Sequence, residues 1–163
     1  MQRITDFDVT RHWMIVERVE NWEADRNNRF SFFGLPRRYR KIASEIRKGD
    51  RLYCYVSRGI GAFADIRVVR DAEIKEMQED SWLDIYHRVF EYYFTTRPLL
   101  VVPREKWLPL SQMTSALEFT RDRSPASIRA LFQTSIRGLS AADAETLTRA
   151  MQAAAGSEAN YAK

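Results

Sequence analysis

The sequence has few of the residues from which disulfide frameworks and metal centres are built. It contains one cysteine, Cys54, and two histidines, His12 and His87. One cysteine excludes an internal disulfide and any zinc site that needs several cysteine ligands. Cys54 shares the apolar face of a predicted strand, so we interpret it as a buried side chain and not as a reactive thiol. We expect both histidines to be structural or exposed, and we expect no metal site and no cofactor.

The sequence also lacks the motifs of common enzyme classes and of membrane proteins. It has no P-loop, GxGxxG, HExxH or GxSxG motif, and we predict no catalytic residue. No apolar run approaches the ~20 residues needed to cross a bilayer. The first residues lack the apolar segment of a secretory signal peptide, so we expect a cytoplasmic protein. The most unusual acid is Asp65, which stands between Ala64 and Ile66, and we expect its carboxylate to face outward.

The chain does have an uneven distribution of charge. The formal net charge is +4, but residues 26–51 carry nine Lys and Arg against two acids, and residues 71–91 carry seven acids against two bases. Basic side chains neutralise phosphates, and aromatic faces stack on nucleic-acid bases. Aromatic residues accompany the basic block: Trp22, Phe30, Phe32, Phe33 and Tyr39. The alternative is a solvated helix face beside core aromatics, and charge alone leaves both interpretations open.

Hydrophobic patterning predicts an α+β chain. We expect strands over residues 12–16, 51–57, 62–69, 87–95 and 99–102, helices over 22–28 and 36–47, and three short helices after residue 110. The Arg58-Gly59-Ile60-Gly61 turn joins the second and third strands into a hairpin. The elements do not alternate as βαβ units, which favours a closed or nearly closed barrel. We expect a single domain over 1–163, with a core at about 10–155 and a frayed tail at 156–163.

Several short motifs occur in an order that resembles the EVE domain, a relative of YTH domains within the PUA-like superfamily. The motifs are Glu20-Asn21-Trp22, Phe33-Gly34-Leu35-Pro36, Lys48-Gly49-Asp50, the YVS strand end at 55–57 and Gly61-Ala62-Phe63-Ala64. Phe33 stands where many members of the family have tryptophan. The resemblance extends over about residues 12–152. It implies a PUA-like small mixed β-barrel flanked by several short helices.

The same resemblance implies non-catalytic binding of nucleic acid, DNA or RNA, through a methylated or hydroxymethylated base. YTH relatives hold N6-methyladenine of RNA in an aromatic cage. Carried over position by position, the residues of the base pocket would be Trp22, Phe32, Phe33, Val56, Ser57 and Trp82. The residues that contact phosphates would be Arg37, Arg38, Arg40, Lys41 and Arg58. No membrane partner is expected.

Two other classes of function stay open. A protein-interaction module would have a closed pocket, in which Phe32, Phe33 and Trp82 pack together without a cavity. An enzyme that acts on a nucleotide or nucleic acid would need a general base or a metal. That enzyme would have to bring His87 and two carboxylates into one cleft.

Overall fold

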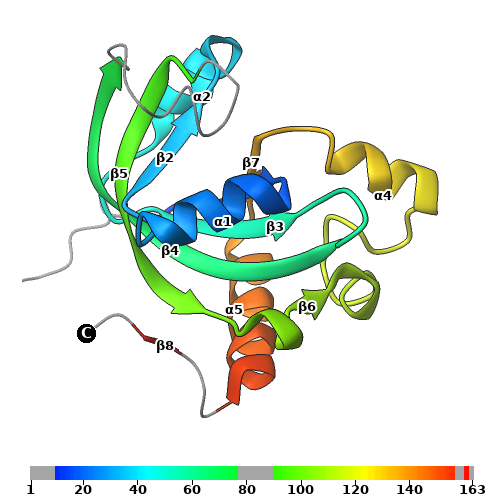
Figure 1. Ribbon diagram of the computed structural model, residues 1–163. Coiled ribbons are helices and arrows are strands. Elements are labelled where there is room, and N and C mark those ends of the chain that lie inside the picture. The colour runs from blue at the N-terminus through cyan, green and yellow to red at the C-terminus, as the bar shows by residue number, and fades with distance from the viewer. Residues whose placement is uncertain (1–9, 77–89, 157–159, 162–163) are drawn as a thin grey trace, which may run out of the picture.

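The computed structural model describes residues 10–76, 90–156 and 160–161. Its centre is one mixed β-sheet of eight strands, curled into a half-barrel (Figure 1). Six strands follow the order β2-β5-β4-β3-β1-β7, while β6 pairs with β4 and β8 pairs with β5. The strands are β1 His12–Glu17, β2 Phe32–Leu35, β3 Arg51–Val56, β4 Ala62–Glu76, β5 Tyr92–Val101, β6 Leu108–Pro109, β7 Ile136–Leu139 and β8 Asn160–Tyr161. The predicted α+β class is confirmed, although the sheet remains open between β2 and β7.

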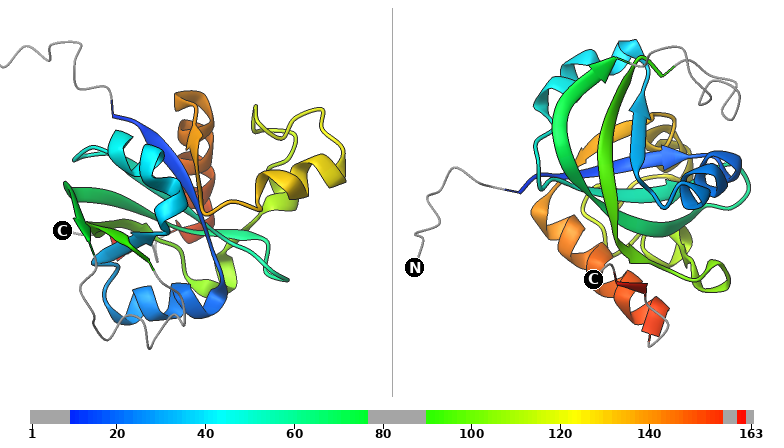
Figure 2. Two further views of the ribbon diagram at one scale, coloured as in Figure 1. Left: turned by 90° about the horizontal axis from the view of Figure 1, so that it is seen from above. Right: turned by 60° about the vertical axis from the view of Figure 1, so that its left-hand side comes forward.

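Short helices flank this sheet on different sides (Figure 2). The α-helices are α1 Val19–Asn27, α2 Arg40–Glu45, α4 Pro125–Leu131 and α5 Ala141–Ala155. Three 3-10 turns are η1 Arg37–Tyr39, η2 Arg104–Lys106 and η3 Leu110–Gln112. Among the described residues, no helix is long and apolar enough to cross a membrane.

The predicted hairpin of β3 and β4 is confirmed. The two strands pair antiparallel, and their turn contains Arg58 at φ 50° and Gly59 at φ 85°. Glycine favours this left-handed conformation because it has no Cβ. Residues 52–56 are nevertheless all buried, so the expected alternation of buried and exposed positions is absent. On one face of β3, the hydroxyl of Tyr53 forms a hydrogen bond of 2.9 Å with that of Thr148 of α5. On the other face, Cys54 lies beside Glu17, which shares the partner Arg67 with Asp25 of α1. Helices therefore cover both faces of β3.

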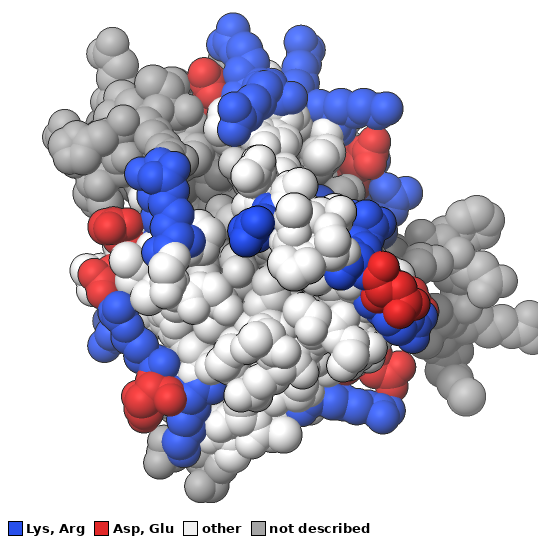
Figure 3. All heavy atoms as spheres, turned by 90° about the vertical axis from the view of Figure 1, so that its right-hand side faces the viewer, with Lys and Arg blue, Asp and Glu red and all other residues white. Residues whose placement is uncertain are grey.

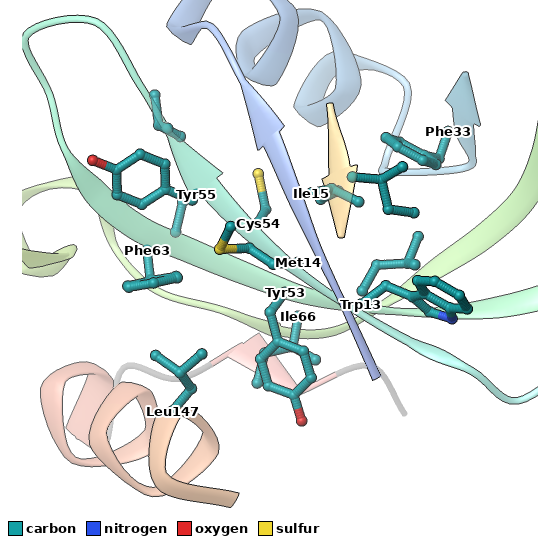
Figure 4. Close-up of a cluster of buried hydrophobic side chains, with 14 of the residues drawn as sticks. Trp13, Met14, Ile15, Phe33, Tyr53, Cys54, Tyr55, Phe63, Ile66 and Leu147 are labelled. Atoms are coloured by element: carbon teal, nitrogen blue, oxygen red, sulfur yellow. The ribbon is translucent and has the colours of Figure 1, made fainter. Parts of the chain in front are cut away.

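The core lies where β1, β3 and β4 pass one another (Figure 4). β1 runs parallel to β3 and antiparallel to β7. Trp13, Met14 and Ile15 are all buried, as expected for a central strand, and the indole of Trp13 donates to Asp50 at 3.0 Å. Cys54 is fully buried, which confirms the prediction of a core cysteine.

Two predicted helices differ in their boundaries. Residues 36–47 form η1 followed by α2 instead of one helix. At the junction the hydroxyl of Tyr39 is bonded to Thr134 and to the N–H of Ser135. α1 begins at Val19, so Asn21 lies inside the helix and does not cap it. The chain enters α1 directly from β1, with Arg18 in an extended conformation.

The C-terminal third contains two helices with side-chain caps. The hydroxyl of Ser124 accepts from the N–H of Ser127 at 3.2 Å, and that of Ser140 accepts from the N–H of Asp143 at 3.1 Å. The sequence predicts two strands, over residues 87–95 and 99–102, but the described residues of this region form one strand, β5. In the expected frayed tail, β8 pairs with Leu100 and Val101 of β5. This backbone pairing satisfies hydrogen-bonding groups that a frayed end would leave to water.

Candidate functional site

A cleft of about 610 Å³ opens where β1 and β3 end. The two strands are parallel and in register, so their carboxyl ends reach the same edge of the sheet. The N–H of Ser57 donates to the carbonyl of Glu17 at 2.8 Å, which ties the two ends together. The lining residues come from five segments: Val16, Glu17, Arg18 and Asn21; Arg38; Tyr55, Ser57 and Arg58; Leu110; and Ile128, Arg129, Phe132, Gln133, Thr134 and Ser135.

Positive charge surrounds this cleft. Four arginines line it: Arg18, Arg38, Arg58 and Arg129. None of them forms a salt bridge with an acid of the described residues, whereas the one acid in the lining, Glu17, is bonded to Arg67. Figure 3 shows the side of the molecule on which α4 lies, with Lys and Arg gathered at its top and an uncharged area at its centre. The arrangement attracts an anionic ligand.

One wall of the cleft is aromatic. The rings of Tyr55 and Phe132 lie 4.2 Å apart between centroids and are tilted by 39°. Burial raises the pKa of Tyr55, so its hydroxyl stays protonated at neutral pH and can donate or accept a hydrogen bond. The wall therefore combines an apolar surface with a polar tip, as in sites for planar ligands.

The opposite side of the cleft carries polar groups in fixed positions. The hydroxyl of Ser57 donates to the carbonyl of Glu17 at 3.2 Å, and the amide of Asn21 projects from α1. The hydroxyl of Tyr39 lies 3.1 Å from that of Thr134 and anchors the 134–135 segment. Burial raises the pKa of Tyr39, but hydrogen bonds to Thr134 and Ser135 and the charge of Arg38 bring it below its ordinary value. These groups can donate to and accept from the edge of a ligand.

A buried cluster of charged residues underlies the cleft. Arg67 of β4 is 0% exposed, and its guanidinium bonds Glu17 at 3.1 Å, Asp25 at 2.7 Å and Asp65 at 2.8 Å. The indole N–H of Trp22 donates to Asp65 at 2.7 Å. Asp65 is therefore fully buried and does not face outward as predicted. The sequence offers Arg67 as the partner of Asp65, because residues i and i+2 of a strand share a face.

The cluster has three carboxyl groups for one guanidinium. Burial raises the pKa of Glu17 well above its usual value; Arg67 opposes this, while Asp25 and Asp65 reinforce it. Burial alone would lower the pKa of Arg67, but the three carboxyl groups raise it well above its usual value. Burial and the two neighbouring carboxyl groups therefore favour the neutral form of Glu17, whereas Arg67 favours its charged form. Among the described residues, no group of three His, Cys, Asp or Glu side chains is arranged to hold a metal ion.

The structure brings three of the predicted site residues to the cleft, namely Ser57, Arg38 and Arg58. Arg37, Arg40 and Lys41 are exposed on η1 and α2 but lie outside its lining. Sequence reasoning missed the other twelve lining residues, among them Arg18, Asn21, Arg129 and Phe132. The motif Glu20-Asn21-Trp22 predicts the right segment of the chain, but the residue that lines the cleft is Asn21 and not the predicted Trp22.

Most of the predicted stacking residues lie elsewhere. Trp22 is 2% exposed and packs on Phe30 and Trp107, so it presents no face to a base. Phe33 and Val56 are also core residues. Phe32 is 38% exposed and meets Tyr93 of β5, away from the cleft lining. Trp82 and His87 lie outside the described residues.

Comparisons with known proteins agree on the fold. No model of a protein family matches the sequence, and no curated protein matches it. The YTH domain of Zygosaccharomyces rouxii MRB1, solved in complex with N6-methyladenosine RNA, matches with a TM-score of 0.62 at 14% identity, over 89% of this chain and 88% of that chain. The Pho92 YTH domain, solved with m6A, gives 0.62 at 11%, over 99% and 94%.

A hypothetical protein from Leishmania major also matches, with a TM-score of 0.63 at 12% identity, over 90% of this chain and 97% of that chain. These likenesses extend over most of each chain. They show that the chain has the YTH and PUA-like fold that the sequence predicts.

Proposed function

We propose that this chain is a non-catalytic nucleic-acid-binding module of the EVE type. It accepts a modified base, methylated or hydroxymethylated, in the cleft and contacts the adjoining phosphates with arginines. The observation that carries the proposal is a cleft ringed by Arg18, Arg38, Arg58 and Arg129, in a fold shared with a YTH domain solved on N6-methyladenosine RNA. Guanidinium groups neutralise phosphates and also stack on bases.

The interior of the cleft suits one planar base. Its volume of about 610 Å³ falls within the usual range of small-ligand sites. Phe132 and Tyr55 provide one apolar wall, and Asn21 and Ser57 provide groups for the hydrogen-bonding edge of the base. Trp82 remains our prediction for a second stacking face. The three tryptophans of the described residues, Trp13, Trp22 and Trp107, are buried and do not serve this purpose.

The ligand is expected to be single-stranded or to have its base flipped out. A base within a duplex is extruded at a cost of a few kcal/mol before it can enter such a site. The one acid in the cleft lining, Glu17, is bonded to Arg67 and is therefore poorly placed to act as the general base of an enzyme.

The test measures binding of single-stranded oligonucleotides by fluorescence anisotropy. Nine-residue RNA and DNA strands carry one central N6-methyladenine, 5-methylcytosine or 5-hydroxymethylcytosine, or the unmodified base. We expect one modified strand to bind about fivefold more tightly than its control, since burial of one methyl group contributes on the order of 1 kcal/mol. Equal binding of modified and unmodified strands across the panel would contradict recognition of the base.

Variants separate contacts to the base from contacts to phosphates. Asn21→Ala should reduce the preference for the modified strand. Arg18→Ala should lower the affinity for modified and unmodified strands by the same factor. Arg149→Ala is the matched control, because Arg149 is exposed on α5 and lies outside the cleft. If Arg18→Ala and Arg149→Ala behave identically, the cleft is not the binding site.

A further inference from the structure

A second groove, of about 510 Å³, adjoins the cleft. The two hollows share Leu110, Ile128 and Arg129, so they meet beside α4. The rest of the groove is formed by the turns that follow η3 and by the loop that leads into α4.

The chemistry of the groove differs from that of the cleft. Ser111, Thr114, Ser115, Arg123 and Arg129 line it together with the apolar side chains of Leu110, Pro125 and Ile128, and more of its surface is apolar than polar. None of the described residues in its lining is aromatic, so it offers no ring on which a base could stack. Hydroxyl and guanidinium groups are the donors that commonly bind phosphate oxygens and sugars.

Positive charge also accumulates next to the groove. Arg137 of β7 lies close enough to Arg123 for that charge to lower its pKa, in addition to the larger effect of burial, with Asp143 opposing. The Nε of Arg137 is buried and has no hydrogen-bond partner. The acid in the groove lining is Asp122, against Arg123 and Arg129. An anion in the groove would relieve this repulsion between like charges.

The walls of the groove are fixed before any ligand arrives. The N–H of Leu110 donates to the carbonyl of Gly61 at 2.9 Å, which ties η3 to the end of the β3–β4 turn. The hydroxyl of Thr120 donates to the carbonyl of Thr114 at 2.8 Å, and Ser124 caps α4. A preformed site loses little conformational entropy on binding.

We infer that this groove binds the sugar–phosphate backbone of the nucleotide next to the base held in the cleft. The inference rests on the proposed function. It means that the chain recognises at least two linked nucleotides of a single strand, and not an isolated modified nucleotide. Arg129, which lines both hollows, lies where it can contact the phosphate that joins the two nucleotides.

The experiment compares a long probe with a short one. The long probe is a nine-residue RNA with one central N6-methyladenosine, and the short probe is N6-methyladenosine 5′-monophosphate, measured by competition in fluorescence anisotropy. Arg123→Ala should lower the affinity for the RNA severalfold and change the affinity for the monophosphate by less than about twofold. It should also make the slope of log K against log salt for the RNA shallower by about 0.7. Ser115→Asp, which adds a negative charge to the groove, should act in the same direction. Arg149→Ala should change neither probe.

The outcomes distinguish this inference from the proposed function. If the wild type prefers modified RNA but Arg123→Ala and Ser115→Asp bind it normally, the groove is not a backbone site, and base recognition stands. If Arg123→Ala weakens both probes equally, Arg123 acts on the cleft, which also overturns the inference. If the wild type binds modified and unmodified RNA equally, the proposed function fails, and the groove inference fails with it. A poly-glutamate peptide that competes as strongly as the RNA would indicate an acidic protein partner instead.

Discussion

At the scale of single residues, the buried Arg67 cluster is the feature with the largest electrostatic consequences. Arg67 links β1 through Glu17, α1 through Asp25 and its own strand through Asp65. Removal of one partner from such a cluster leaves a buried charge uncompensated, which usually costs about 3–5 kcal/mol. Because Glu17 also lines the cleft, the cluster fixes the segment from which Arg18 and Asn21 project.

The raised pKa of Glu17 predicts how stability depends on pH. A carboxyl group whose pKa is higher in the folded state than in the unfolded state stabilises the fold when it is protonated. This stabilisation is complete below the unfolded-state pKa, and it is lost as the pH rises through the folded-state pKa. Glu17→Gln keeps a neutral side chain at every pH. We therefore expect the free energy of unfolding of Glu17→Gln, relative to wild type, to increase from pH 5 to pH 9.

Urea unfolding followed by circular dichroism at several pH values measures this difference. Glu145→Gln is the control, because Glu145 is exposed on α5 and pairs only with Arg149 among the described residues. A difference between Glu17→Gln and wild type that is constant with pH would show that Glu17 is ionised throughout.

The error over Asp65 shows what alternation in a strand can and cannot reveal. Strict alternation would place Asp65 on the same face as Phe63, but the pairing shifts register there, so that Asp65 lies opposite Cys54 and Phe63 opposite Tyr55. Alternation also does not say what covers each side. α1 covers the side of Asp65, and Trp22 from that helix completes its hydrogen bonds. Trp22, which the sequence suggested as a ligand-binding residue, therefore belongs to the core. The errors over Asp65 and Trp22 have the same cause, because the sequence did not show that α1 covers this side of β4.

At the scale of elements, the sequence was most informative where local chemistry decides the conformation. The β3–β4 turn follows from Gly59 and Gly61, and the starts of α4 and α5 follow from Ser124 and Ser140. The hydrogen bond of Tyr39, at the junction of η1 and α2, was not predictable, because its partner Thr134 lies 95 positions away. The cleft was missed in part for the same reason, since it joins β1, β3 and the 128–135 segment.

Asp143 shows how one side chain joins two elements. It lies in the first turn of α5, where its N–H donates to Ser140, and its carboxylate accepts from the N–H groups of Glu118 at 2.7 Å and Phe119 at 3.2 Å. Asp143→Ala would leave both N–H groups without this acceptor. We expect a loss of about 2–3 kcal/mol in the free energy of unfolding, measured in urea. Glu145→Ala on the same helix should cost less than about 0.5 kcal/mol, and an equal loss in both variants would contradict the role of Asp143.

At the scale of the whole molecule, an open sheet gives the fold its binding surface. The predicted barrel is a half-barrel, because β2 and β7 end the sheet without pairing with each other. The parallel pair of β1 and β3 places two strand ends at one edge, and the segment from α4 to β7 closes the third side of the cleft. Composition predicted the excess of positive charge, but only the fold shows that Arg18 and Arg129 face the same hollow.

This distribution of charge predicts the salt dependence of binding. The arginines of the cleft and groove are Arg18, Arg38, Arg58, Arg129 and Arg123. Each contact to a phosphate of a single strand contributes about −0.7 to the slope of log K against log salt, so four to five contacts predict a slope between about −2.8 and −3.5 for the nine-residue RNA. N6-methyladenosine without phosphate should bind with a slope near zero, because the base itself carries no charge. A slope near zero for the RNA as well would mean that these arginines do not contact phosphates, and the cleft would then have to be regarded as a site for an uncharged ligand.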